Sequence, residues 1–239
     1  MKIFQRLITG RMLAPGFTVR MAVTYTILFA FFNVYGQDTI IKSGDTWKYL
    51  DKGTFDIESN SLLKLKSLNW REGPTPIGFG QGDEATVINN VDENDSVLTY
   101  FVFRKTIMLD NPDEYKSFLL RLVRDDGAVI YVNGKEVVRS NLPEGKISQK
   151  TLASTLVSGL AEYTYYEYFI SPSCFQKGEN TFTVILFQFR PISSDCRFDM
   201  ELLGYKDYKV INSLIHNINS VIFLPGVLTW PLTKATRPS

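Results

Sequence analysis

The sequence predicts an all-β protein, an antiparallel β-sandwich with jelly-roll architecture. Roughly eight segments alternate apolar and polar residues with a period of two, as half-buried strands do. Glycine, proline and asparagine turns separate these segments, and little helical periodicity lies between them. A chain of 239 residues is long enough to bury one such core and still carry terminal extensions.

The stretch 117–140, SFLLRLVRDDGAVIYVNGKEVVRS, organises the rest of the chain. Apolar residues alternate with polar ones in its first segment, which predicts a strand. The residues at 124–127 then interrupt the run, because aspartate and glycine favour turns. Asn133-Gly134 is typical of a type I′ hairpin turn, whose twist matches paired strands. We therefore expect three strands in this stretch.

Further strands are predicted on both sides of this unit. Tyr163–Ile170 is an aromatic strand in which Tyr166, Tyr168 and Ile170 share one face, and Tyr163, Tyr165 and Glu167 share the other. The remaining predicted strands are Trp47–Leu50, Leu98–Met108, Thr181–Phe189 and Arg197–Leu202.

The first 36 residues are typical of an export signal. Basic residues precede an uncharged run at 21–35, and cleavage is expected between Gly36 and Gln37. An uncleaved membrane anchor is the alternative, but such a run is shorter than the roughly 20 residues that a spanning helix needs. We expect a secreted, periplasmic or cell-surface protein with no stable membrane span after cleavage. The sandwich is then 37–205.

Residues 206–239 form a tail of a different character. Apolar residues recur at helical spacing from Val210 to Ile222, opposite a face rich in asparagine and serine. A short amphipathic helix is expected there, followed by a disordered end.

Two cysteines, Cys174 and Cys196, lie on either side of the predicted strand Thr181–Phe189. A strand of about nine residues spans roughly 30 Å, whereas a disulfide needs Cα atoms within about 7 Å. Free, buried cysteines are favoured over a bridge.

The balance of charge argues against a nucleic-acid partner, since 26 lysines and arginines face 25 aspartates and glutamates. The glycine-rich stretch 71–83 is not a phosphate loop, because Asp83-Glu84 follows its last glycine where lysine and serine or threonine would be required. The acidic loop 89–96 offers Asp92, Glu93 and Asp95 as oxygen ligands for calcium, although a solvated loop without a metal is the more ordinary interpretation. No cofactor is expected beyond this structural calcium.

Five fragments in order resemble the galactose-binding-domain-like jelly-roll modules of secreted bacterial proteins. They are GDTWKYLDKG, NWREGPTPIGFGQGDEAT, YFVFRKT, LRLVRDDGAVIYVNGKEVVRSNLP and GENTFTVILFQFRPISSDCRFDMEL. The resemblance covers 44–203 and implies a jelly-roll β-sandwich that binds ligands through loops at one end. Modules of this type accompany metallophosphoesterases and carbohydrate-active enzymes. The chain departs from the pattern at its two cysteines, in its lack of an attached enzyme and after Tyr205.

The fold and the export signal lead us to expect a non-catalytic extracellular module that binds a glycan or a cell-surface component. Candidate contacts are Trp70, Phe79, Tyr163 and Tyr165, since aromatic faces suit the apolar faces of sugars. Burial of these residues in the core is the alternative for each. Other interpretations are a structural domain that contacts proteins, or a truncated accessory domain of a metallophosphoesterase-type hydrolase.

Catalysis is not expected. His216, the one histidine, cannot by itself furnish a two-metal centre, and no serine is presented as a G-x-S-x-G nucleophile. Asp125 and Asp126 are a conceivable glycosidase pair, but adjacent strand residues point to opposite faces, and a role in the turn is simpler.

Overall fold

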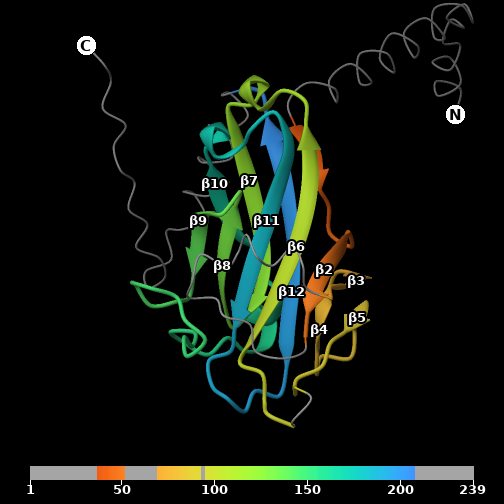
Figure 1. The fold of residues 1–239 in the computed structure, drawn as a ribbon, viewed down its shortest axis with the longest axis vertical. Helices are drawn as coiled ribbons and strands as arrows, with labels where there is room; N and C mark the ends of the chain where they lie inside the picture. The colour runs from red at the N-terminus through yellow and green to blue at the C-terminus, as the bar shows by residue number, and fades with distance from the viewer. Residues whose placement is uncertain (1–36, 52–68, 93–94, 208–239) are drawn as a thin grey trace, which may run out of the picture. The chain divides into compact units, whose positions relative to one another are not determined.

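The computed structural model describes residues 37–51, 69–92 and 95–207, which form a β-sandwich of two six-stranded sheets (Figure 1). Three short 3-10 turns, η2 (Pro112–Glu114), η3 (Gly159–Tyr163) and η4 (Pro172–Cys174), join some of the strands. No α-helix occurs within these residues, as the alternating sequence pattern predicted. The predicted export signal, the segment at 52–68 and the tail from 208 lie outside the described residues.

Sheet A is built around its last strand. β12 pairs with β7 along one edge, whereas its other edge pairs with β4 near one end and with β1 near the other. β10 extends the sheet beyond β7, and β5 pairs with β4 in parallel. The members are β1 (Gln37–Ile41), β4 (Ile77–Phe79), β5 (Thr86–Val87), β7 (Ser117–Asp125), β10 (Tyr166–Ile170) and β12 (Cys196–Tyr205).

Sheet B has the order β3-β2-β6-β11-β8-β9, and all of its pairs are antiparallel. The ten-residue strands β6 and β11 form its centre and pass in front of β12 in Figure 1. The members are β2 (Thr46–Leu50), β3 (Arg71–Pro74), β6 (Tyr100–Leu109), β8 (Gly127–Val132), β9 (Lys135–Ser140) and β11 (Gly178–Phe187).

Large aromatic side chains fill the space between the two sheets. Phe198 of β12 stacks on Phe103 of β6 with ring centroids 4.2 Å apart, and it meets Trp47 of β2 edge-on at 5.1 Å. All three are fully buried. Such aromatic pairs contribute about 0.5–1.5 kcal/mol beyond the burial of their area, so this cluster joins sheet A to sheet B.

The stretch 117–140 contains the three predicted strands, β7, β8 and β9. β8 and β9 form the expected hairpin, with Asn133 and Gly134 at φ values of 53° and 82°. β7 and β8 do not pair. They belong to different sheets, and the interruption predicted at 124–127 is shorter than expected, because β7 includes Arg124 and Asp125 and β8 begins at Gly127. Asp126 alone connects the two strands across the sandwich.

The predicted strand Tyr163–Ile170 is wrong in its first half, because β10 begins only at Tyr166. Tyr163 ends the turn η3 instead. The Glu162 carboxylate accepts a hydrogen bond of 2.9 Å from the backbone N–H of Gly159, and Thr164 N–H donates to Ala161. These local bonds close the backbone into a turn and compete with an extended conformation.

Both cysteines are free, as predicted. Cys196 is buried at the start of β12, but Cys174 in η4 is only half-buried, so the prediction of burial holds for one of them. In the described part of the chain, no helix is long and apolar enough to cross a bilayer.

Candidate functional site

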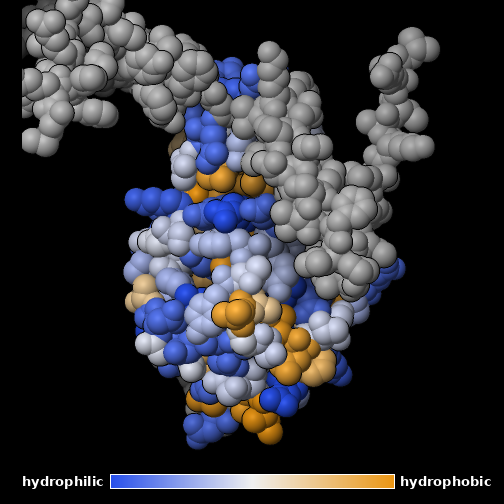
Figure 2. Space-filling view, turned by 180° about the vertical axis from the view of Figure 1, so that it is seen from behind, coloured by the Kyte–Doolittle hydropathy of each residue, from blue (hydrophilic) through white to orange (hydrophobic). Residues whose placement is uncertain are grey.

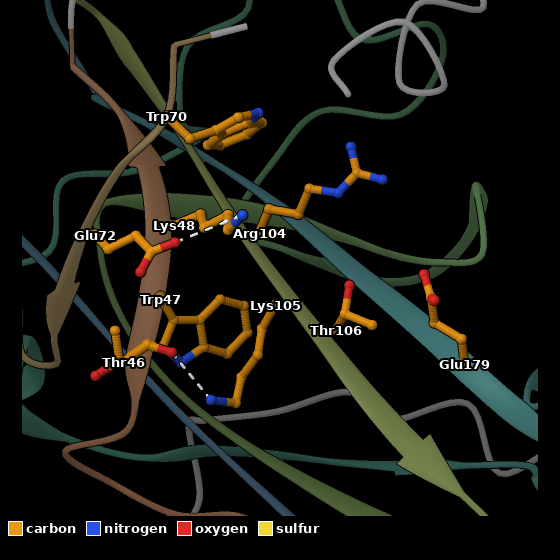
Figure 3. A pocket seen from close by; sticks show the side chains of 9 residues that line it. All are labelled: Thr46, Trp47, Lys48, Trp70, Glu72, Arg104, Lys105, Thr106 and Glu179. Carbon is orange, nitrogen blue, oxygen red and sulfur yellow. Dashed lines mark hydrogen bonds and ion pairs between the residues drawn. The ribbon is translucent and has the colours of Figure 1, made fainter. Parts of the chain in front are cut away.

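A groove of about 520 Å³ opens on sheet B where strands β2 and β6 separate (Figure 3). The ladder between these strands runs only from Leu50 to Lys48, which pairs with Arg104. Beyond that pair the two strands diverge and their side chains fill the gap. The groove is lined by Thr46, Trp47, Lys48, Trp70, Glu72, Arg104, Lys105, Thr106 and Glu179.

Because side chains alternate along a strand, the residues on the outer face of sheet B point into this groove. Lys48, Arg104 and Thr106 point outward from sheet B, as their neighbours Phe103 and Trp47 point into the core. Glu179 projects from β11 on the same outer side, beyond Thr106 in Figure 3. The groove is therefore polar along its walls although it lies on a strongly apolar sheet.

Two of the three cations in the groove already have anionic partners. Lys48 Nζ lies 3.5 Å from Glu72 Oε1. Lys105 Nζ lies 3.2 Å from Asp45 Oδ2 and donates to the Thr46 carbonyl at 3.0 Å. These contacts fix the positions of both lysines at the edges of the groove.

Arg104 is in a different situation. Its Nη1 is buried and has no hydrogen-bond partner among the described residues. Burial lowers the pKa of this guanidinium, and the nearby Glu179 carboxylate opposes that effect. An arginine stays charged under such a shift, and a buried N–H without an acceptor is costly. This N–H is therefore a position where an acceptor oxygen from a ligand would gain a strong hydrogen bond.

Trp70 provides the aromatic wall. It stands one residue before β3 and is half-buried, packed against an apolar cluster on the outer side of sheet B that includes Leu50, Tyr100 and Val102. Figure 3 shows the Trp70 ring and the Arg104 guanidinium toward the same end of the groove. Trp47, by contrast, is fully buried, with the Lys105 ammonium 5.9 Å from its ring centre.

The structure does not bring the four sequence-predicted contact residues together. Phe79 is only 9% exposed and packs against Phe101 with ring centroids 5.9 Å apart, so the core alternative holds for it. Tyr163 is exposed, donates to Gln81 Oε1 at 2.6 Å and lies under the Arg197 guanidinium.

Tyr165, just before β10, is also separated from Trp70. It donates to Asp199 Oδ2 at 2.9 Å, and the Arg121 guanidinium lies 4.5 Å from its ring centre. Tyr163 and Tyr165 thus belong to the sheet A side of the molecule, whereas Trp70 belongs to the groove on sheet B.

The acidic loop 89–96 is held by its own backbone and side chains. Asp92 Oδ1 accepts from the Ser96 N–H at 2.9 Å, and Asp95 is exposed with a φ of 60°. Glu93 lies outside the described residues. A calcium site at Asp92, Glu93 and Asp95 stays a prediction.

The adjacent aspartates after β7 have unlike surroundings. Asp126 accepts two backbone hydrogen bonds of 2.7 Å, from Val157 N–H to Oδ1 and from Phe189 N–H to Oδ2. These bonds tie two loops to the turn, which supports the structural interpretation of Asp126. Asp125 Oδ2 is buried without a hydrogen-bond partner within the described part of the chain.

The comparisons with known proteins show no family for this chain. No family model matches the sequence, and no curated protein matches it. Membership of the galactose-binding-domain-like family therefore stays a prediction. The chain is similar to parts of solved glycoside hydrolases, in which it spans about a third of their length or less.

Three such structures illustrate the likeness. A β-glucuronidase from Bifidobacterium dentium, complexed with coumarin-3-O-glucuronide, has a TM-score of 0.40 at 12% identity over 64% of this chain and 20% of its own. A β-glucuronidase from an uncultured Clostridium species has a TM-score of 0.43 at 15% identity, over 71% and 29%. A β-D-mannosidase from Dictyoglomus thermophilum has a TM-score of 0.36 at 16% identity, over 63% and 15%.

The groove residues other than Trp70 escaped the sequence analysis. Arg104 carries a modest signal, because it directly follows the apolar run YFVF and lies on the strand face opposite the core. Glu179 and Lys48 carry no comparable signal, because charged residues on an outer strand face are ordinary.

Proposed function

We propose that this chain is a non-catalytic module that binds a glycan in the groove between β2, β3, β6 and β11. The observation that carries the proposal is the pairing of a half-buried tryptophan with an arginine whose Nη1 has no acceptor in the described structure. An indole face suits the C–H face of a pyranose ring, and a guanidinium suits hydroxyl or carboxylate oxygens. Glu72, Glu179 and Thr106 add acceptors and a hydroxyl at the walls.

Charge favours a glycan that carries carboxylate or sulfate groups over a neutral one. Lys48 and Lys105 are each paired with a carboxylate, whereas Arg104 has an N–H to offer. An anionic oxygen would compensate the desolvation of this guanidinium.

Binding is tested with the purified chain on an array of neutral and anionic glycans, followed by calorimetry on the strongest binder. Trp70→Ala removes the stacking surface and is expected to lower affinity at least 10-fold, which is a loss of about 1.4 kcal/mol or more in binding free energy. Arg104→Met is expected to abolish the preference for anionic glycans. Tyr165→Phe, on the other sheet, is the matched control and leaves binding unchanged.

Two results would overturn the proposal. One is the absence of binding to every glycan by a sample that unfolds cooperatively. The other is binding that is retained in Trp70→Ala and Arg104→Met but lost in variants of Tyr163 or Tyr165, which would move the ligand to the sheet A side.

The absence of catalysis is part of this proposal, and it is supported by two carboxylates that already have partners. Asp126 is taken up by two backbone N–H groups, and Glu72 by Lys48. Secretion or display at the cell surface, and a place as an accessory domain beside a hydrolase, are further proposals that follow from the sequence. Fractionation of the native host tests the first of these.

A protein partner is the second candidate, favoured by exposed apolar residues on loops. Leu160 in η3 is 88% exposed and Ile192, before β12, is 80% exposed. Figure 2 shows apolar patches among hydrophilic side chains in its lower half. Exposed apolar patches mark contact surfaces. This function would be supported if the chain binds no glycan but captures a cell-surface protein, and if the double variant Leu160→Ser, Ile192→Ser no longer captures it.

A further inference from the structure

Three carboxylates from distant parts of the chain meet at one end of sheet A. Asp125 ends β7, Glu162 lies in η3, and Asp195 comes directly before β12. One carboxylate oxygen from each lies within 4.8 Å of those of the other two. Asp125 and Glu162 are buried, and Asp195 is half-buried. The turn η3 packs against β7 and covers the end of that strand, so the three carboxylates do not lie on an open surface.

Asp125 is the unusual member, because it is only 2% exposed and its Oδ2 has no hydrogen-bond partner among the residues that the structure describes. A buried acceptor left unsatisfied costs about 1–3 kcal/mol. Native proteins rarely keep such an atom unless a ligand, an ion or a water occupies the space beside it. This orphaned oxygen is an observation independent of the gathering of acidic groups.

The neighbouring arginines do not compensate the cluster. Arg197 faces Asp125 in the β7–β12 register, but its Nη1 pairs with Asp83 Oδ1 at 2.5 Å. Arg124 donates to Ser140 Oγ and to the Asp126 carbonyl. Among the described residues, neither arginine therefore makes an ion pair with Asp125.

Gln81 completes the site. Its Nε2 donates to Glu162 Oε2 at 2.8 Å and to Asp195 Oδ2 at 3.0 Å, while the Tyr163 hydroxyl donates to its Oε1 at 2.6 Å. The two ends of a glutamine amide differ only in hydrogen-bond pattern. Rotation by 180° turns Oε1 toward the carboxylates and Nε2 toward the Tyr163 oxygen, which accepts as well as donates. Gln81 then supplies a fourth oxygen.

Second contacts hold the ligand carboxylates in place. Glu162 Oε1 accepts from the Gly159 N–H, and Ser194 Oγ donates to Asp195 Oδ1 at 2.9 Å. Each leaves the residue's other oxygen directed toward Gln81. Metal-ligating side chains are typically held in orientation by such additional hydrogen bonds.

We propose that Asp125, Glu162, Asp195 and Gln81 bind one divalent cation of the calcium class. Carboxylate and amide oxygens are the ligands of hard cations, and calcium accepts several carboxylates in irregular geometry, whereas magnesium usually takes one or two and keeps its waters. The cation would cross-link the end of β7, the turn η3, the segment before β12 and the loop after β4. It is separate from the groove on sheet B and from the loop at 89–96.

The proposal is tested by titrating Ca²⁺ and Mg²⁺ into the full chain after removal of metal with a chelator, by calorimetry and by thermal unfolding. One Ca²⁺ per chain is expected, bound more tightly than Mg²⁺ and raising the melting temperature. Asp195→Asn and Glu162→Gln keep side-chain shape and one acceptor oxygen, and each is expected to lower Ca²⁺ affinity at least 30-fold. Asp92→Asn separates this cluster from the calcium site predicted in the loop at 89–96, and full Ca²⁺ affinity in this variant is expected if the cation binds at the cluster.

Terbium provides a readout in the folded protein that does not depend on stability. Terbium bound at the cluster is sensitised by the adjacent Tyr163, so emission that Ca²⁺ displaces is expected from the unmodified chain, and its loss is expected in Asp195→Asn. A Ca²⁺ dissociation constant weaker than about 1 mM, the weak end of protein calcium sites, would overturn the proposal. So would unchanged affinity in both carboxylate variants, or a loss found in Asp92→Asn alone.

Discussion

The two adjacent aspartates at the crossing between the sheets are expected to differ sharply in their effect on stability. Asp126→Asn preserves shape but leaves one oxygen where two backbone N–H groups, of Val157 and Phe189, now find acceptors at 2.7 Å. A hydrogen bond to a charged group contributes about 1.5–3 kcal/mol, and an unsatisfied buried N–H costs about 1–3 kcal/mol. We expect the free energy of unfolding to fall by about 3–5 kcal/mol.

That loss is a large fraction of the roughly 5–15 kcal/mol that stabilises an ordinary domain. It is measured by urea denaturation, followed by circular dichroism, in excess chelator so that bound cations do not contribute. With a urea m-value of about 2 kcal/mol/M, the midpoint falls by about 2 M. Asp125→Asn, one residue away, is the control, and a change below about 1 kcal/mol is expected because Oδ2 of Asp125 makes no hydrogen bond in the described structure. Equal effects of the two variants would refute this reasoning.

Three further predictions concern the core, a sheet junction and alkaline pH. Phe198→Ala removes the ring that joins the sheets and is expected to cost about 3–5 kcal/mol in urea denaturation; a cost below about 1 kcal/mol would contradict the packing described here. Gly78→Ala places a Cβ 1.9 Å from the Cys196 carbonyl oxygen, so a clearly lower melting temperature is expected, and an unchanged one would show that β4 can move aside. Burial, with the charge of Asp199, raises the pKa of Tyr165 to about 12, above the value of about 10 in the unfolded chain. This contribution to stability is present below pH 10 and is lost as the pH rises toward 12. Tyr165→Phe is therefore expected to flatten the fall in urea midpoint above pH 10, and parallel curves for the two proteins would rule out this origin.

The fold could be predicted where the signal is local. Asn133-Gly134 requires positive φ at two successive positions, and only a tight hairpin accommodates that pair easily, so the β8–β9 connection followed from two residues. The alternation of apolar residues before the interruption at 124 likewise identified most of β7, which the structure extends to Asp125. What alternation does not encode is the partner of a strand. Nothing in the residues at 124–127 indicates that β7 and β8 belong to different sheets.

Tyr163 shows why the aromatic stretch was assigned wrongly. Its tyrosines favour strands, but Glu162 bonds the Gly159 backbone and keeps this part of the chain in a turn. Propensity was overridden by one side chain acting on nearby backbone.

The binding groove and the carboxylate cluster are harder cases, because their residues meet only through tertiary structure. Glu162 and Asp195 reach the end of β7 at Asp125 from two separate connecting segments, and no spacing in the sequence records this. Aromatic content pointed to Trp70 but equally to Phe79, and only burial separates them.

The pairing of β1 with β12 has a mechanical consequence. Gln37 is opposite Tyr205, so the chain enters and leaves the sandwich at neighbouring points. Tension applied through the two ends would load one hydrogen-bonded pair at a time, as a zipper opens, beginning at Gln37 and Tyr205. Antiparallel strands pulled from the same end resist far less than strands sheared along their length. Under load β1 would detach first, while the long ladder of β12 with β7 stays intact. The module would therefore be poorly suited to transmit force between its two ends.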